Sequence, residues 1–380
     1  MMKDKEIGLY IHVPFCKSKC NYCDFNSYAG MEELIPEYFN SMKKEIEFYR
    51  ERLRDYTIGT VFIGGGTPSM VEEKYIVDIL DICFKTMKIS NEAEISIEAN
   101  PGTVNLNKLF SYRNAGINRL SMGLQAWQDH ILQYIGRIHK ARDFSDNIEA
   151  ARKAGFENIN ADLMFGLPGQ TINDWEETLK AVDDLGVEHI SCYSLKIEEG
   201  TVLGEKLDSG ELIPVEDELD RAMYDSAIEF LKSKKFMRYE ISNFAKPGFQ
   251  CRHNLIYWRA EEYIGLGAGA HSYFENNRFN NVNKIKDYIR NIQEGNGIIE
   301  NVQFINLEES MSEYMILGLR LTEGVNIAKF KERFGQNIFD VWGEVIEKNV
   351  RKGLLTMENE SIQLTSKGFD LANSVFVEFI

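Results

Sequence analysis

Residues 7–23 read IGLYIHVPFCKSKCNYC, a short apolar run followed directly by three closely spaced cysteines. The apolar run at 7–13 predicts a buried strand. Cys16, Cys20 and Cys23 then form a C-x3-C-x2-C motif. A [4Fe–4S] cube normally takes four cysteines, so three thiolates would leave one iron without a protein ligand. Such an iron is open to a chelating small molecule.

A structural zinc site is the alternative interpretation of these three cysteines. Structural zinc usually takes four ligands, often in two separated pairs, so His12 or Asp24 would have to complete the set. A disulfide scaffold would be shorter and richer in cysteine than this 380-residue chain with six. The other cysteines, Cys83, Cys192 and Cys251, are widely separated and are expected to be buried as small apolar side chains.

Strand and helix patterns alternate through most of the first 280 residues. Strands are expected at 7–13, 60–63, 94–98, 117–122, 159–164, 189–195 and 237–244. This alternation predicts right-handed βαβ crossovers and a parallel sheet. Six or seven units favour an α/β fold in the form of a partial, TIM-like (β/α) barrel. In such a barrel the loops that follow the strands form the functional face.

The last hundred residues differ because helical patterns dominate. Helices expected at 307–319, 327–334 and 341–350 precede a two-stranded hairpin at 353–365, which resembles a winged-helix arrangement. We therefore expect a barrel domain over 1–280 and a helical, winged-helix-like domain over 281–380. The 43 basic and 59 acidic residues give a net charge of −16, which argues against nucleic-acid binding.

No apolar run reaches the length of a transmembrane helix, and no apolar segment of signal-peptide type follows the first residues. We therefore expect a cytoplasmic protein.

Polar residues and glycines stand where several expected strands end. Gly65, Gly66 and Thr67 follow the second strand, where glycines allow the backbone to approach a ligand closely. Asp162 lies inside an apolar strand, where a carboxylate is costly unless it is paired. Further polar residues near strand ends are Glu98, Gln125 and Arg137. Taken singly, each also suits an ordinary structural role.

Together these motifs resemble the radical S-adenosylmethionine (SAM) superfamily. The resemblance implies that the amino and carboxylate groups of SAM chelate the open iron, and that an electron from the cluster yields a 5′-deoxyadenosyl radical. It implies cluster ligation by Cys16, Cys20 and Cys23. The implied SAM contacts are Tyr10, Tyr22, Gly65, Gly66, Thr67, Glu98, Gln125, Arg137 and Asp162.

Three further segments are similar to the oxygen-independent coproporphyrinogen III oxidase group: YIHVPFC at 10–16, YEISNFA at 239–245 and GLGAGAHSY at 265–273. Within that group, the oxidases usually carry a fourth cysteine where this chain has Phe25. HNLIYW at 253–258 resembles the H-N-x-x-Y-W motif of the HemW branch, described as haem chaperones that pass haem to acceptor proteins.

This resemblance implies haem as cargo, with His253 as a haem contact; a buried, hydrogen-bonded histidine is the alternative. His12, which precedes the cysteines on a strand, is expected to be structural or to support residues that contact the cluster. The expected partners are haem or porphyrin, an electron donor and a haem-acceptor protein, for which a membrane-associated protein is one candidate. The alternative function is oxidative decarboxylation of two coproporphyrinogen III propionates to give protoporphyrinogen IX, so whether the chain is an enzyme is left open. The resemblance to the oxidases also leaves open whether a second SAM molecule binds.

Overall fold

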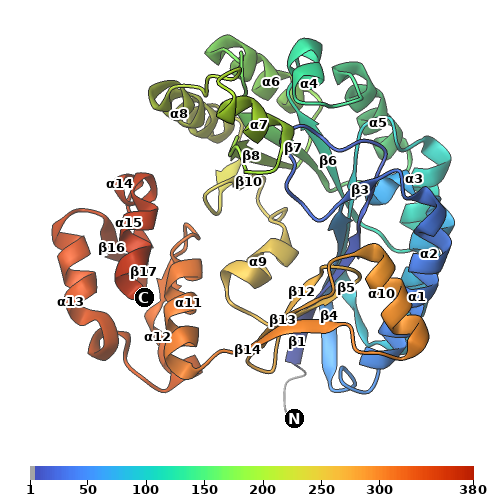
Figure 1. Ribbon diagram of the computed structural model, residues 1–380. Helices are drawn as coiled ribbons and strands as arrows, with labels where there is room; N and C mark the ends of the chain where they lie inside the picture. Colours follow the sequence, from blue (N-terminus) through green and yellow to red (C-terminus); the bar gives the residue numbers. More distant parts are fainter. Residues whose placement is uncertain (1–4) are drawn as a thin grey trace.

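The structure is a computed structural model that describes residues 5–380. Its central feature is a twelve-stranded sheet in which six strands lie side by side and run parallel. They are β1 (Lys5–Val13), β4 (Tyr56–Gly65), β5 (Ile89–Ala99), β6 (Arg119–Gln125), β7 (Ile159–Phe165) and β8 (His189–Ser194). Figure 1 shows the sheet curving, with helices on its outer face. The predicted partial barrel is confirmed.

The helices that follow these strands cover the outer face of the sheet. The longer ones are α1 (Ile35–Tyr49), α2 (Glu73–Thr86), α3 (Leu106–Asn114), α5 (Ala141–Lys153), α6 (Ile172–Asp184) and α8 (Asp217–Ser233). The shorter ones are α4 (Asp129–Tyr134) and α7 (Val202–Asp208). Local sequence sets their starts: α6 begins with a capping box in which Thr171 and Asp174 satisfy each other's backbone N–H.

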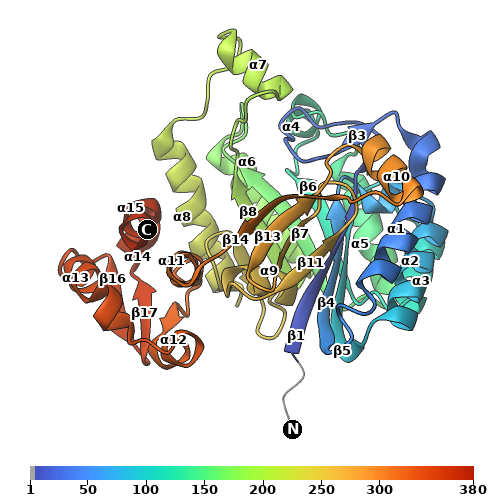
Figure 2. The same cartoon turned by 60° about the horizontal axis from the view of Figure 1, so that its bottom comes forward.

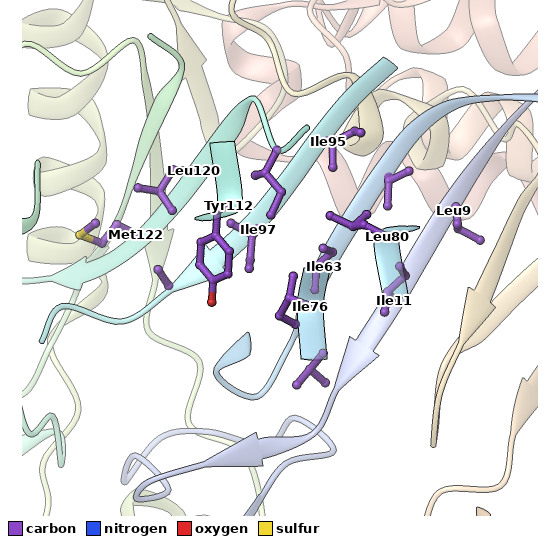
Figure 3. Packing of buried hydrophobic residues seen from close by; sticks show 14 of the residues in the cluster. Leu9, Ile11, Ile63, Ile76, Leu80, Ile95, Ile97, Tyr112, Leu120 and Met122 are labelled. Carbon is purple, nitrogen blue, oxygen red and sulfur yellow. The ribbon is translucent and has the colours of Figure 1, made fainter. Parts of the chain in front are cut away.

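The two faces of the sheet differ because successive strand residues point to opposite sides. On β1, Leu9 and Ile11 join the large core that packs against the helices, and Figure 3 shows them beside Ile63 of β4. The intervening Tyr10 faces the barrel interior and lines two cavities there. The same period of two recurs on the other parallel strands. The interior of the barrel is therefore polar, while its helix-facing side is apolar.

Shorter strands flank these six on both sides. β11 (Tyr263–Leu266) pairs with β1 and also runs parallel to it. β12 (His271–Phe274), β13 (Asn277–Asn281) and β14 (Ile299–Phe304) continue that edge with antiparallel pairing. At the other edge lie β10 (Asn243–Ala245) and β9 (Met237–Arg238). The single strand predicted at 237–244 is therefore wrong. The chain turns between its halves because Glu240 accepts hydrogen bonds from Ser242 N and Asn243 Nδ2.

The C-terminal elements form a second core beside the barrel (Figure 1). They comprise α11 (Leu307–Gly318), α12 (Ile327–Phe334), α13 (Ile338–Arg351), α14 (Ser366–Asp370) and α15 (Ala372–Phe376). The hairpin of β16 (Leu355–Glu358) and β17 (Ser361–Leu364) is joined by β15 (Val325–Asn326). The predicted helical, winged-helix-like character is thus confirmed. The added strand has only two residues, too short for a periodic signal.

The domain boundary predicted at residue 280 stays a prediction. α10 (Ile285–Glu294) contributes Ile285, Tyr288 and Ile289 to the barrel core, and β14 belongs to the barrel sheet. The second core begins with Met311. Residues 285–304 therefore pack with the barrel.

The cysteine segment lies at the carboxyl end of the parallel strands, as the barrel interpretation expects. Figure 2 shows the starts of β1, β4 and β5 at one end of the barrel, and β3 (Tyr28–Ala29) with α7 at the other.

None of the helices within residues 5–380 combines the length and apolar character that crossing a membrane requires.

Candidate functional site

The cysteine segment is held to the barrel by a histidine. His12, buried at the end of β1, bonds Tyr10 Oη through Nδ1 at 2.9 Å and the carbonyl of Asn26 through Nε2 at 2.9 Å. Asn26 in turn donates to the carbonyl of Ala268 at 3.1 Å. Both ring nitrogens of His12 are therefore hydrogen-bonded, and the bond of Nε2 fastens the loop to β1.

The three thiols lie on the wall of one cavity and have donors beside them. Cys16, at the end of β2 (Phe15–Cys16), accepts from Thr67 Oγ1 at 3.6 Å, and Cys20 accepts from Arg137 Nη1 at 3.6 Å. Burial raises the pKa of Cys16 and of Cys23. Metal binding by these thiols must therefore displace protons. Hydrogen bonds to sulfur of this kind tune the potential of an Fe–S cluster.

The described side chains around the three thiols do not form a binding site for a single metal ion. Among residues 5–380, no group of three or more histidine, cysteine, aspartate or glutamate side chains is arranged to hold one ion. A cube differs in its demand, because each thiolate binds a separate iron.

A cavity of about 330 Å³ collects most of the predicted site. Its lining includes Cys16, Cys20, Cys23, Tyr22, Gly65, Gly66, Thr67, Glu98, Gln125, Arg137 and Asp162. Of the predicted SAM contacts, Tyr10 alone lines only the adjoining cavities. The structure thus brings together residues that are up to about 150 positions apart in the chain.

The turn at the end of β4 requires glycine at positions 65 and 66. A Cβ on Gly66 would lie 2.7 Å from the carbonyl oxygen of Phe15 and 3.0 Å from Cys16 Sγ. Gly65 has a φ of +114°, and its Cβ would lie 2.5 Å from the His12 ring. The turn therefore lies directly against the cysteine loop.

Glu98 faces this turn from β5. Its Oε2 accepts a hydrogen bond from Gly65 N at 3.1 Å. Burial, followed by the charge of Asp162, raises the pKa of Glu98 to about 7, although the Gly65 N–H opposes the shift. Glu98 therefore changes charge near neutral pH.

Gln125 is turned toward the cavity by an irregularity in β6. The pairing of β6 with β7 shifts between Gly123 and Gln125, and Gln125 has a φ of +72°. A bulge of this kind re-aims a side chain at the end of a strand. Gln125 thereby lines the cavity at 9% exposure.

Asp162 is held by two neighbours that the sequence interpretation missed. Its Oδ2 accepts from Ser121 Oγ at 2.9 Å, and its Oδ1 accepts from Asn160 Nδ2 at 2.8 Å. Both neighbours are interior residues of β6 and β7, so the period of two along these strands predicts their face of the sheet, whereas the contact of Ser121 with Asp162 depends on strand register. The paired carboxylate expected at Asp162 is present, with Asn160 on the same strand and Ser121 on the neighbouring β6.

Arg137 spans the cavity wall between the cluster loop and β6. Its Nη2 donates to Asn100 Oδ1 at 2.9 Å and also to the carbonyl of Gly123, while Nη1 reaches Cys20. Its Nε is buried without a hydrogen-bond partner among the described residues. Burial lowers the pKa of Arg137, but Tyr22 and Cys20 outweigh it and the net shift is upward. A buried cation with an unused donor suits an anionic or strongly accepting ligand group.

His253 lies on α9 (Arg252–Trp258) and faces the barrel interior at 1% exposure. Its Nδ1 bonds Thr60 Oγ1 at 2.7 Å, and its Nε2 bonds Tyr257 Oη at 2.8 Å. Burial, together with the charge of Arg119, lowers the pKa of His253 to about 3. Iron ligation by His253 stays a prediction, and it would require one of these two hydrogen bonds to break.

Two further cavities adjoin the first. One of about 170 Å³ lies among Tyr10, Arg119, Asp162, His253 and Tyr257. The other, of about 440 Å³, is lined by Tyr10, His12, Phe25, Asn26, Gly65, Glu98, Tyr257, Tyr263, Gly269, His271 and Asn283. Shared lining residues join the three spaces around one mouth of the barrel.

Comparison with known proteins shows which family has this fold and this sequence pattern. The model of the radical SAM superfamily matches residues 10–182, and that of the HemN C-terminal domain matches residues 305–371. The haem chaperone HemW of Bacillus subtilis is 38% identical over 98% of each chain. The chain belongs to the HemW family of radical SAM proteins. The HemW of Lactococcus lactis is 34% identical over 100% of this chain and 98% of its own.

Among solved structures, coproporphyrinogen III oxidase (HemN) from Escherichia coli, described as a radical SAM enzyme, superimposes with a TM-score of 0.87. The match covers 99% of this chain and 90% of that one at 21% identity, so it shows the fold. Membership of the radical SAM superfamily implies a [4Fe–4S] cluster and SAM. The donor set of the 330 Å³ cavity fits both groups: three thiols, glycines against the loop, a fixed carboxylate and a buried arginine.

Proposed function

We propose that this chain is a haem chaperone, which binds haem and delivers it to an acceptor protein. The observation that carries this proposal is similarity along the whole chain to curated proteins named haem chaperone HemW, at 38% and 34% identity. The cargo is haem or a related porphyrin. The partners are an acceptor protein and an electron donor. We place this work in the cytoplasm.

In this proposal Cys16, Cys20 and Cys23 each bind one iron of a cube and leave the fourth iron open. Thr67 and Arg137 donate to two of the thiolates, which lowers the electron density on sulfur. When bound at the open iron, SAM supplies a group that one-electron reduction can cleave. The protein's part is to hold it in place and to exclude water.

The predicted SAM contacts would divide that work by their chemistry. The backbone of Gly65 and Gly66 allows close approach, and Asp162, fixed by Ser121 and Asn160, accepts from hydroxyl or ammonium groups. Arg137 offers its unused Nε–H. Glu98 holds or releases a proton near neutral pH. Tyr22, Thr67 and Gln125 complete the walls of the SAM cavity, and Tyr10 lines the adjoining cavities.

The proposal is tested by two anaerobic measurements on the same reconstituted protein. Titration with haem should give saturable binding with one haem per chain. Incubation with coproporphyrinogen III, SAM and a reductant should give no protoporphyrinogen IX. Catalytic formation of protoporphyrinogen IX would instead establish the oxidase function, and absence of saturable haem binding would refute the chaperone proposal.

A further inference from the structure

The 440 Å³ cavity presents an imidazole that neither the mechanism above nor the predicted site uses. His271 begins β12 and is exposed, and its side chain lines this cavity with Tyr257, Tyr263 and Phe25. Within the described residues, its ring nitrogens have no hydrogen-bond partner. A histidine with both nitrogens free at the wall of a cavity is available to a ligand.

The other five histidines of the chain do not combine these properties. Four of them are buried, with a ring nitrogen or both hydrogen-bonded inside the protein: His12, His139, His189 and His253. His130 is exposed on α4 and lines none of the three cavities. His271 is therefore the one histidine that is exposed, unbonded and in a cavity, among the residues that the structure describes.

The aromatic part of the cavity wall suits a flat ligand, while His12, Asn26, Glu98 and Asn283 make the rest of the wall polar. The volume of the cavity lies in the range of small-molecule sites. The Tyr257 and Tyr263 rings pack edge to face with centroids 4.7 Å apart, and Phe25 is 66% exposed at the mouth. A planar aromatic ligand would cover that exposed ring. Phe25 stands where the related oxidases usually carry a fourth cysteine, so the residue there is apolar and not a metal ligand.

We propose that His271 is the axial ligand of the haem iron and that Phe25 packs against the porphyrin in the same cavity. This rests on the proposed chaperone function. Neutral imidazole is a natural ligand of haem iron. Burial, followed by the charge of Arg278, lowers the pKa of His271, so the ring is neutral at pH 7. Placing the haem here leaves the hydrogen bonds of His253 intact and sets the haem beside the SAM cavity, with which it shares Gly65 and Glu98 as wall residues.

The test is an anaerobic titration of the full-length, reconstituted protein with ferric haem, followed by difference absorption and by electron paramagnetic resonance (EPR) of the iron. His271→Ala should weaken haem binding at least ten-fold and remove the imidazole-ligated signature, and added imidazole should restore that signature. Phe25→Ala should weaken binding while the signature remains. His130→Ala, which changes an exposed histidine outside the cavities, should change neither.

His253→Gln separates the two candidate ligands, because glutamine cannot replace imidazole at iron. It should keep the imidazole-ligated signature, with circular dichroism used to confirm its fold. An unchanged signature in His271→Ala, or its loss in His253→Gln alone, would overturn the assignment and leave the chaperone function standing. A wild-type protein that binds no haem would refute both.

Discussion

Gly66→Ala isolates the fit between the glycine turn and the cysteine loop. The new methyl would lie 2.7 Å from the carbonyl oxygen of Phe15, 2.9 Å from the carbonyl carbon of Pro14 and 3.0 Å from Cys16 Sγ. Two of these neighbours are backbone atoms, so relief requires the loop itself to move. Overpacking of this kind costs about 1–3 kcal/mol, and the lower entropy of the unfolded alanine chain returns about 0.4–1 kcal/mol of it.

The free energy of unfolding should therefore fall by about 1–2 kcal/mol, and the barrel should remain folded. The affinity for the cluster should fall by a larger amount. Displaced supporting contacts at metal sites typically cost about 10–100-fold in affinity. The assay is anaerobic reconstitution with iron and sulfide analysis, beside urea unfolding of the same samples. Gly297→Ala is the matched control, because its Cβ would meet nothing within 4 Å and its φ is not positive. Full iron and sulfide content in Gly66→Ala would refute this reasoning.

Three further predictions concern single contacts. Asp162→Asn, which keeps the size of the side chain, should weaken SAM binding by about ten-fold, about 1.4 kcal/mol, in equilibrium dialysis; unchanged binding would remove Asp162 from the site. Glu98 has a folded pKa of about 7 against an ordinary value of 4.5, so its contribution to stability is present below pH 4.5 and is lost as the pH rises through 7. The free energy of unfolding of Glu98→Gln, measured with urea, should therefore rise relative to that of the wild type from pH 5 to 8, and the difference should level off on the order of 3 kcal/mol. A difference that does not depend on pH would contradict this. Arg320 stacks on Trp258 with its guanidinium 4.4 Å from the ring centroid, so Arg320→Ala should cost about 1–2 kcal/mol in the same assay, whereas exposed Arg54→Ala should cost almost nothing.

Local patterns in the sequence predict the barrel well because each parallel strand carries its own signal. Ile7, Leu9 and Ile11 alternate with interior residues on β1, and the helices between strands show their own periodicity. The cysteine triad is equally local. The site at the ends of the strands follows from these two observations and the rule that parallel strands end on one side.

Contacts across strands could not be predicted, since they depend on register. Ser121 of β6 reaches Asn160 and Asp162 of β7 because the register sets Ser121 opposite Asn160. The bulge that turns Gln125 inward leaves no mark in composition. The hydrogen bonds of His253 similarly involve Thr60, nearly two hundred residues away. Whether a histidine is bonded or free is a property of the folded neighbourhood.

In the proposed mechanism, one iron of the cluster has no ligand from this chain and is therefore open to SAM. Every role proposed for the 330 Å³ cavity requires this open iron. The direct test is EPR of the reduced, reconstituted protein, recorded with and without SAM. A signal of a [4Fe–4S] cluster that changes when SAM is added, and no longer does so in a variant that lacks the side chains of Arg137 and Asp162, is the predicted result. A signal that SAM leaves unchanged, or a protein that holds stoichiometric zinc and no cluster, would contradict it.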